Sequence, residues 1–420
     1  MYALLDCNNF YASCERVSNP SLTGKPVCVL SNNDGCVIAR SNEAKSLGIP
    51  MGAPAFKYEK IFEENKIFLY SANFPLYGDL SNRVMNIIGR YCKEVEIYSI
   101  DEAFMNFNGY MNLNLREYCL DLRKYILKGI GIPTSIGIAP TKTLAKAANR
   151  IAKKYPEKTD NVYIIDSPEK IEKALKWLHI EDIWGIGKRL NKRLRTKGIR
   201  KAYELVNLPE TFIRQEMGIV GIRIINELKG IPQFDIDLPA RKKSIATTRT
   251  FDYMTDKIED LKERVATFAI KCSEKLRAQQ SCCNYVTVFL HTNFFRGDLI
   301  QYHPTVTLTL SNPHNSAIEL SKCAQKALEA IYKKGYQYKK AGVIVSGLIP
   351  ESERQISLFD EDYYLKHQPI MKIIDKLNHK YHEDKLKLGC QDIKSTWKMK
   401  QTRLSKRFST DIREIIQVKV

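Results

Sequence analysis

Apolar and polar positions in the first part of the chain follow two periods, one typical of strands and one typical of helices. Residues 2–7 (YALLDC) form an unbroken apolar run joined to an acid, which predicts a short buried strand. Residues 78–92 have helical apolar spacing. The pattern then predicts two strands at 95–100 and 103–107, a helix at 114–128, a strand at 133–139 and a helix at 141–153. Apart from an insertion at 18–77 rich in Asn, Gly and Pro, this order is the ferredoxin-like split βαβ pattern.

The rest of the chain predicts a helical segment, a linker, a second mixed domain and a tail. Residues 168–230 are helical and basic, and 232–243 (PQFDIDLPARKK) is typical of a linker. A second β-α-β-β-α-β order follows, with strands at 244–251, 284–293, 306–311 and 341–349 and helices at 256–280 and 316–334. A polar tail begins at 351, and one amphipathic helix is predicted after Pro369 from apolar residues at Ile370, Ile373, Ile374 and Leu377. The predicted fold class is a multidomain α+β protein.

The charge of the chain predicts a polyanionic partner. Its 66 Lys and Arg outnumber 47 Asp and Glu, for a net charge of +19. For a folded chain this points to nucleic acid, although a generally basic cytosolic protein is the alternative. The eleven cysteines are scattered without CxxC pairs, which indicates free thiols in a reducing compartment. With neither a signal peptide nor a long apolar run, a cytoplasmic protein with no membrane contact is expected.

Two adjacent acids, Asp101 and Glu102, interrupt the pair of strands at 95–107. Successive strand residues point to opposite faces, so one of the two is expected to point toward the core. The split pattern brings the end of the first strand, with Asp6, beside them. Three clustered carboxylates repel one another unless cations lie among them, and a pair of Mg²⁺ ions suits phosphoryl transfer. The alternative is that all three are ordinary acids at strand ends.

Four long stretches then resemble a known family. They are MYALLDCNNFYASCERV, LSNNDGCVIARSNEAKSLGIPMG, EIYSIDEAF and SIGIAPTKTLAKAANRIAK. In this order they closely resemble the Y-family translesion DNA polymerases, and within that family the UmuC branch, the catalytic subunits of bacterial DNA polymerase V and their plasmid- and phage-borne relatives. The resemblance implies a right-hand polymerase with a palm (1–17 and 78–166), fingers (18–77), a helix-hairpin-helix thumb (167–231), a little finger (240–350) and a C-terminal tail (351–420).

The resemblance implies a reaction for the acids. Asp6, Asp101 and Glu102 match the metal ligands of the family, with the Cys7 carbonyl as a backbone ligand. Two Mg²⁺ ions would then support attack of a primer 3′-hydroxyl on the α-phosphate of a dNTP. The implied activity is error-prone, DNA-directed synthesis across damaged template, in an SOS-type response to DNA damage that causes mutation.

The resemblance also implies residues that contact the incoming nucleotide. Tyr11 matches the steric gate, whose ring leaves no room for a ribose 2′-hydroxyl; without the family it would be interpreted as a packed tyrosine. Phe10 beside it falls within the nucleotide site, although packing is the simpler interpretation.

Lys45 and Lys153 match positions that contact the triphosphate, although either alone would be interpreted as a surface lysine. Asn42 stands where many relatives have a tyrosine, and we expect it to donate to a phosphate. Asn9 likewise stands where relatives often have an aromatic residue.

Two basic stretches are candidates for DNA binding. Residues 183–200 (IWGIGKRLNKRLRTKGIR) resemble a helix-hairpin-helix, with seven cations and no acid after position 185. Like charges at helical spacing repel one another, so a phosphate partner is favoured over a solvated helix face. The predicted contacts in this stretch are Gly185, Gly187, Lys188, Arg189 and Lys192. Those at the start of the little finger are Arg241, Lys242, Lys243 and Arg249.

The tail carries candidate partner sites. Gln355, Leu358 and Phe359 match the QxxLF peptide with which bacterial polymerases bind the β sliding clamp, and local packing of the tail is the alternative. The later stretch WKMKQTRLSKRFST resembles the end of the UmuC branch. In that branch a processed UmuD-type dimer and a RecA filament are partners, and we expect the tail to help hold them.

Two other functions compete with the polymerase interpretation. A helix-hairpin-helix nuclease would use the same acids on a hydrolytic water, and dependence of the product on dNTPs separates the two activities. A non-catalytic scaffold that binds the clamp and DNA as a checkpoint is the second. The three acids argue against that scaffold, which has no need for them.

Overall fold

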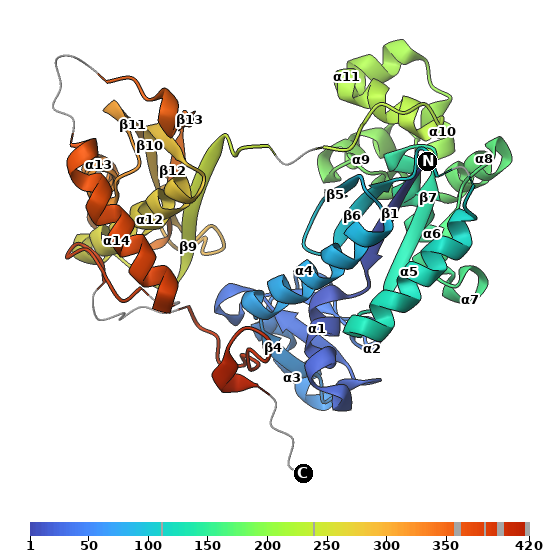
Figure 1. The fold of residues 1–420 in the computed structure, drawn as a ribbon, viewed down its shortest axis with the longest axis horizontal. Helices are drawn as coiled ribbons and strands as arrows, with labels where there is room; N and C mark the ends of the chain where they lie inside the picture. The colour runs from blue at the N-terminus through green and yellow to red at the C-terminus, as the bar shows by residue number, and fades with distance from the viewer. Residues whose placement is uncertain (111, 238–239, 357–362, 382–383, 393–398, 416–420) are drawn as a thin grey trace. The chain divides into compact units, whose positions relative to one another are not determined.

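The computed structural model describes all of the chain except residues 111, 238–239, 357–362, 382–383, 393–398 and 416–420. The chain divides into two compact units, one formed by Met1–Pro239 with Gln401–Val420 and the other by Ala240–Lys400 (Figure 1). The division falls inside the stretch 232–243 that the sequence predicts as a linker. None of the described helices is both long enough and apolar enough to cross a bilayer.

The first unit is built on a five-stranded sheet with the order β5-β6-β1-β7-β8. Its strands are β1 (Tyr2–Cys7), β5 (Val95–Ile97), β6 (Glu102–Asn106), β7 (Thr134–Ala139) and β8 (Val162–Ile164). Strand β1 pairs antiparallel with both β6 and β7, so it lies in the middle of the sheet, as the split pattern predicts. The short strand β8, which pairs parallel with β7, was not predicted, because three residues are too few for a periodicity.

Helices pack on both faces of this sheet. The main ones are α4 (Phe74–Tyr91), α5 (Leu115–Ile130) and α6 (Lys142–Lys154). All six residues of β1 are buried, and alternate side chains enter two different cores. Leu5 packs in the core that includes α4 and α5, whereas Leu4 packs in the core that includes α6. Asp6 has the same parity as Leu4, so its side chain is directed toward α6.

Local sequence explains where α4 and α6 lie. Helix α4 begins four residues before the predicted start at 78, because the Asn73 side chain accepts from the Leu76 amide and a proline occupies the first turn. Helix α6 lies so close to β7 that a Cβ on Gly137 would be 2.0 Å from the Asn149 backbone nitrogen. A glycine is therefore needed on β7 for this helix to reach the sheet.

The insertion at 18–77 has a regular structure that the sequence did not predict. It contains a second sheet with the order β3-β2-β4 and its own small core. The strands are β2 (Val27–Leu30), β3 (Val37–Arg40) and β4 (Phe68–Ser71). The helices are α2 (Asn42–Ser46) and α3 (Ala55–Glu64), and α1 (Phe10–Ser18) leads into the insertion. Four-residue strands among Asn, Gly and Pro give too short a pattern to recognise.

The predicted basic helical segment forms a helical cluster beside the first sheet. The short helix α7 (Pro156–Thr159) precedes it. The helices of the cluster are α8 (Pro168–Trp177), α9 (Lys188–Thr196), α10 (Ala202–Val206) and α11 (Glu210–Leu228). Helices α8 to α11 contribute to the core that contains Leu4 and residues of α6. Helix α11 has a kink at Gly218, whose φ is +68°.

The second unit has the predicted β-α-β-β-α-β order of elements. They are β9 (Ser244–Thr255), α12 (Ile258–Ala278), β10 (Ser281–Thr292), β11 (Thr305–His314), α13 (Ala317–Ile331), β12 (Tyr338–Ser346) and β13 (Ile349–Pro350). The sheet order is β11-β10-β12-β9, with β13 paired to the start of β10. The single strand predicted at 341–349 is wrong. Gly347, with φ at +63°, ends β12 and separates it from β13.

The helix predicted after Pro369 begins earlier, as α14 (Tyr364–Tyr381), with Pro369 inside it. The predicted apolar face is only partly packed, because Ile370 and Ile373 are 47% and 57% exposed whereas Ile374 and Leu377 are half-buried. Met371 is buried instead, and both oxygens of Asp375 accept from Arg277 of α12 at 2.6 Å. A bidentate ion pair thus helps to set which face of α14 packs on the second unit.

Candidate active site

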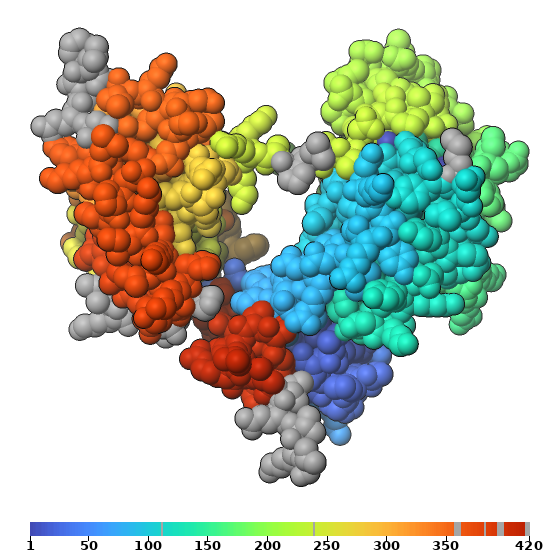
Figure 2. Space-filling model, in the orientation of Figure 1, coloured from blue at the N-terminus to red at the C-terminus, as the bar shows by residue number. Residues whose placement is uncertain are grey.

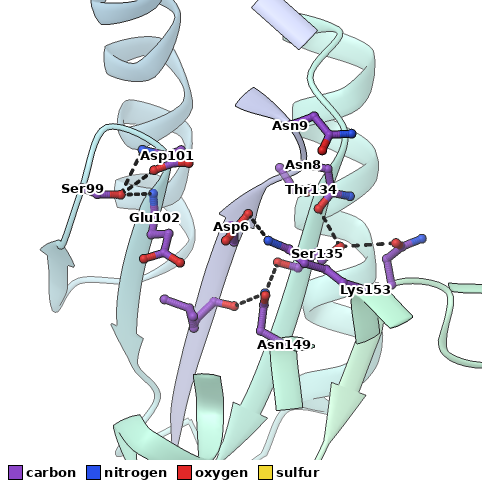
Figure 3. Close-up of polar contacts among 12 residues, drawn as sticks. Asp6, Asn8, Asn9, Ser99, Asp101, Glu102, Thr134, Ser135, Asn149 and Lys153 are labelled. Atoms are coloured by element: carbon purple, nitrogen blue, oxygen red, sulfur yellow. Dashed lines mark hydrogen bonds and ion pairs between the residues drawn. The ribbon is translucent and has the colours of Figure 1, made fainter. Parts of the chain in front are cut away.

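The three predicted acids come together at one end of the first sheet (Figure 3). Asp6 on β1 lies directly opposite Glu102 in the antiparallel register with β6. The Cys7 amide donates to the Asp101 carbonyl at 2.9 Å, which fixes the third acid beside the same strand end. Strand pairing therefore places these residues together, as the split pattern predicted.

Strand alternation separates the side chains of the two adjacent acids. Glu102 is directed to the same side as Asp6, toward α6. Asp101 precedes β6, and its carboxylate accepts from Ser99 Oγ at 2.6 Å. The expectation that one of the adjacent pair points toward the core is met in part, because Glu102 is directed toward α6 but remains half-buried. Asp6 is the buried acid, at 8% exposure, because it lies on the central strand.

Two lysines on one face of α6 hold the acids in ion pairs. Lys153 Nζ pairs with Asp6 Oδ1, and Lys146 Nζ lies 2.9 Å from Glu102 Oε2. The lysines are seven residues apart, which is two helical turns and the same face. Between them, Asn149 Nδ2 donates to the Ser135 carbonyl at 2.7 Å and binds this face to β7. Sequence reasoning found Lys153 and missed Lys146, although the seven-residue spacing could have indicated it.

The acids differ in how their surroundings change their pKa. Burial raises the pKa of Asp6 to about 7, against the opposing charge and hydrogen bond of Lys153, and Glu102 raises it further. Burial also acts to raise the pKa of Glu102, but hydrogen bonds and charges from Lys146, Asp6 and Lys153 leave it below its ordinary value. It is therefore unfavourable for Asp6 and Glu102 to be ionised at the same time, and a divalent cation bound between them would remove this repulsion.

The donor set suits a hard cation. Asp6 and Glu102 offer neighbouring carboxylate oxygens, the ligand type that Mg²⁺ and similar ions prefer. Among the residues that the structure describes, no three His, Cys, Asp or Glu side chains form a ready-made metal site. The Asp101 carboxylate accepts from Ser99, while Asp6 and Glu102 are paired with lysines. Burial raises the pKa of the Cys7 thiol far above its ordinary value, so this residue would have to act through its carbonyl.

Tyr11 lies beside the acids on the first turns of α1. Its half-buried ring stacks on Tyr77 at 4.6 Å and 17°, and meets the edge of Phe74 at 6.0 Å. Burial raises the pKa of Tyr11, and the charge of Asp101 adds to the rise. Phe10 is 4% exposed within the core of the first unit, so its burial favours packing over contact with a nucleotide.

The predicted phosphate contacts form a linked polar group. Asn9 Nδ2 donates to Asn42 Oδ1 at 2.9 Å, and Lys45 Nζ donates to Asn9 Oδ1 at 2.5 Å. Burial lowers the pKa of Lys45, and the charges of Arg40 and Lys153 lower it further. Lys45, Arg40 and Lys153 thus lie close enough to repel one another, and a bound polyphosphate would offset this repulsion. Arg40 was missed, because a single arginine at a strand end has no distinctive pattern.

The predicted helix-hairpin-helix has the expected glycines. Gly185 has φ at +92°, and a Cβ there would lie 2.7 Å from Ile224 Cδ1. Gly187 is the N-cap residue of α9. At this turn, backbone amides at a helix N-terminus can face a phosphate.

The argument from repulsion along α9 is partly wrong. Arg193 and Lys197 pair with Glu216, and Arg195 pairs with Glu181, so three of the seven cations share two acidic partners on neighbouring elements. These acids are distant in sequence and could not be counted from the local stretch. The predicted contacts Lys188, Arg189 and Lys192 are exposed.

The remaining predicted contacts lie on the second unit. Arg241, Lys242, Lys243 and Arg249 are all exposed, at or just before β9. Gln355 is exposed as well. Leu358 and Phe359 of the predicted clamp peptide lie outside the described residues.

Family models match most of the chain. Residues 5–150 match the impB/mucB/samB family, and residues 242–358 match the C-terminal domain of that family. Residues 368–418 match a domain of unknown function. The first two matches cover the two regions in which the sequence predicted mixed domains.

Full-length relatives agree with these matches. The chain is 37% identical to the protein UmuC of Salmonella typhimurium, with all of both chains covered, and 36% identical to ImpB of Salmonella typhimurium, with 99% of each covered. It is 27% identical to DNA polymerase IV 1 of Bacillus subtilis, with 97% of each chain covered. Among solved structures, a Y-family polymerase chimera of Dbh and Dpo4 matches with a TM-score of 0.69 and 23% identity, over 83% of this chain and 99% of that one. The resemblance seen in the four sequence stretches is confirmed.

Proposed function

We propose that this chain, which belongs to the impB/mucB/samB family of Y-family DNA polymerases, is an error-prone DNA polymerase that extends primers across damaged template. The observation that carries the proposal is the pairing of Asp6 with Glu102 at the end of a buried central strand, with Asp101 beside them. A buried carboxylate pair is costly unless cations bind it, and phosphoryl transfer needs cations at this kind of site.

In this assignment the first sheet and its helices are the catalytic palm. The proposed bounds are palm 1–17 and 78–166, fingers 18–77, thumb 167–231, little finger 240–350 and tail 351–420. The acids belong to the palm, and Lys45 and Asn42 belong to the fingers. An incoming nucleotide would therefore be bound by both regions of the first unit.

Asp6, Asp101 and Glu102 would hold two Mg²⁺ ions, with the Cys7 carbonyl as a further ligand. When bound, the ions activate the primer 3′-hydroxyl and stabilise the charge on the transferred phosphoryl group. Lys146 keeps Glu102 charged, and Lys153 holds Asp6 in place and favours its charged form against the effect of burial.

The other residues of the site position the nucleotide. Lys45 and Arg40 offer positive charge to the triphosphate, and Asn42 a polar side chain beside them. The Tyr11 ring lies under the sugar and excludes a 2′-hydroxyl. Lys153, beside Asp6, completes the positive charge at the triphosphate end.

Two exposed basic groups would bind the DNA backbone, one at the start of α9 and one along β9. The proposed protein partners are the β sliding clamp, through Gln355, Leu358 and Phe359, and a UmuD-type dimer with a RecA filament. The proposed location is the bacterial cytoplasm, at the nucleoid, where a DNA substrate would be found.

The test is primer extension opposite an abasic site, with Mg²⁺, clamp, a UmuD-type dimer and activated RecA present. Wild type should extend the primer with dNTPs, and Asp101→Ala should not. The exposed acid Asp252 supplies a matched control, because Asp252→Ala should extend normally. Wild type that binds primer-template yet never extends it would contradict the proposal, and cleavage independent of dNTPs would favour the nuclease. Neither the nuclease nor the scaffold is supported by the relatives, among which the activity named is DNA polymerase.

A further inference from the structure

The domain of unknown function is divided between the two units. Its match runs from 368 to 418, but the chain belongs to the second unit up to Lys400 and to the first unit from Gln401 onward. In Figure 2 the atoms of this last segment, in red, lie against the blue atoms of the first part of the chain. Residues 401–407, named here the return segment, make the contacts described below.

Backbone hydrogen bonds attach the return segment to the edge of the small sheet. The Ser71 amide donates to the Arg403 carbonyl at 2.9 Å, and the Arg403 amide donates to Ser71 Oγ at 3.0 Å. Ser71 and Leu404 form a parallel β-bridge. Because β4 is an outer strand of its sheet, the return segment covers backbone groups that would otherwise form an open edge.

Side chains add a second set of contacts, to the buried Asn73 and to Asp34. Asn73, which is fully buried and caps α4, donates from Nδ2 to the Ser405 carbonyl at 3.1 Å and to Ser405 Oγ at 3.0 Å. Asp34 Oδ2 accepts from both the amide and the hydroxyl of Thr402, at 3.0 and 3.1 Å. The return segment is therefore held by specific partners along its length.

One of these contacts reaches the site through a buried acid. Glu15 on α1 is 2% exposed, and its Oε1 accepts from Tyr77 OH at 2.5 Å and from Ser405 Oγ at 3.1 Å. A buried carboxylate needs such donors, and each one that is lost leaves a desolvated charge poorly compensated. The ring of Tyr77 is fully buried and stacks on Tyr11 at 4.6 Å.

We infer that the return segment is a positioning element for Tyr11, acting from Ser405 through Glu15 and Tyr77. This inference rests on the proposed role of Tyr11 as the residue that excludes ribonucleotides. Ser405 fixes the Glu15 carboxylate, Glu15 fixes the Tyr77 hydroxyl, and the Tyr77 ring sets the plane of Tyr11. Selection of the sugar thus depends on the far end of the chain, because small displacements at a reacting site have large kinetic effects.

The test compares full-length Ser405→Ala with Ser409→Ala, the same change at an exposed serine four residues later. The measured quantity is the ratio of kcat/KM for a dNTP to that for the matching ribonucleotide, under conditions in which wild type extends primers. Ser405→Ala should lower this ratio by about threefold to tenfold, because a buried carboxylate loses one donor and part of that loss reaches Tyr11. Ser409→Ala should keep the wild-type ratio, and Ser405→Thr, which retains a hydroxyl, should restore it.

A second variant separates positioning from general loss of structure. Tyr77→Phe keeps the stacked ring and removes the hydroxyl that Glu15 binds. The double variant Ser405→Ala with Tyr77→Phe should lower the ratio of kcat/KM values by less than the product of the two single fold-changes, because both substitutions act through Glu15. Multiplicative effects would overturn the inference.

The same measurements distinguish failure of the inference from failure of the proposed function. Tyr11→Ala should raise ribonucleotide use strongly. If it does, and a folded Ser405→Ala protein keeps the wild-type ratio, the inference alone is overturned. If Tyr11→Ala leaves ribonucleotide use unchanged, the proposed role of Tyr11 and the inference are both overturned.

Discussion

The two units contain the same order of elements, β-α-β-β-α-β, but place their first strand differently. In the first unit β1 lies between β6 and β7 and is buried along its whole length. In the second unit β9 is an outer strand that pairs with β12, and exposed and buried residues are mixed along it. A central strand can bury an acid among paired neighbours, whereas an outer strand presents its side chains to a ligand in solution. The comparison teaches that position in the sheet, rather than order in the chain, separates a reaction centre from a binding surface.

The largest expected effect lies at the end of the central strand. Glu102→Gln keeps the size of the side chain but removes a charge that a metal needs, so kcat should fall by roughly a thousandfold or more. Arg249→Gln, on the outer strand, should leave kcat within about twofold at saturating DNA, because its contact is with the DNA backbone. Steady-state extension at saturating DNA and dNTP measures both. Equal losses of kcat would remove the distinction between the strands.

The next largest effect is expected on stability, from replacing a tightly packed glycine in the sheet of each unit. Gly137→Ala puts a Cβ 2.0 Å from the Asn149 backbone nitrogen of α6, whereas Gly342→Ala on β12 meets side-chain atoms of Phe289 and Thr248 at 2.4 to 2.6 Å. A helix backbone cannot move aside as a side chain can, so Gly137→Ala should cost about 3 kcal/mol or more and Gly342→Ala less. Urea unfolding measures both.

Gly129→Ala is the control for these two variants. Gly129 lies in α5 with open space around its Cα, so a methyl group there should stabilise the protein slightly. A larger loss for Gly342→Ala than for Gly137→Ala would contradict the account of how α6 reaches the sheet.

A third effect follows from the buried acid. Unfolded Asp6 loses its proton near 3.8, but in the folded protein it keeps the proton to about 7. Between these values the folded state binds more protons, so the stability contributed by Asp6 is present at low pH and is lost as pH rises through 7. Asp6→Asn should therefore stabilise the metal-free protein by about 2 to 3 kcal/mol more at pH 8 than at pH 5.

Thermal unfolding in the presence of a chelator checks this, with the exposed Asp252→Asn as the control. The control should shift stability by the same small amount at both pH values. A gain from Asp6→Asn that does not grow with pH would show that Asp6 ionises freely in the folded protein.

The smallest effects are expected on the basic surfaces. Lys188→Ala and Arg249→Ala should each weaken binding to primer-template severalfold and reduce the slope of log affinity against log salt by about 1. Arg195→Ala is the matched control on α9, because Arg195 already pairs with Glu181 and should change the salt slope less. Fluorescence anisotropy across a range of salt concentrations measures the slopes. A slope that is unchanged for Lys188→Ala would exclude that residue from DNA contact.

Sequence alone predicted the parts of the molecule that depend on long periodic segments. The unbroken apolar run of β1 indicated a buried strand, and the split pattern placed it centrally and brought Asp6 to Asp101 and Glu102. The helix at 141–153 was predicted as well, whereas Lys153 was named from the family resemblance and its neighbour Lys146 was overlooked. These features follow from repeating local patterns, which a single sequence contains.

The parts that were missed depend on partners far away in sequence. Glu216, on another helix, pairs with Arg193 and Lys197, and Ser405 reaches Glu15 from the opposite end of the chain. The packed face of α14 is set by its pair with Arg277 rather than by its apolar spacing. No periodicity encodes such contacts, because they arise only when the elements have packed.

The most direct test of the central claim is the addition of one dNTP to a labelled primer, measured in a single turnover for wild type and Asp6→Asn. The account predicts rapid, Mg²⁺-dependent addition by wild type and a loss of at least roughly a thousandfold in Asp6→Asn, with primer-template affinity unchanged. Addition by Asp6→Asn at a rate close to that of wild type would contradict the claim that the buried end of the central strand is the polymerase centre.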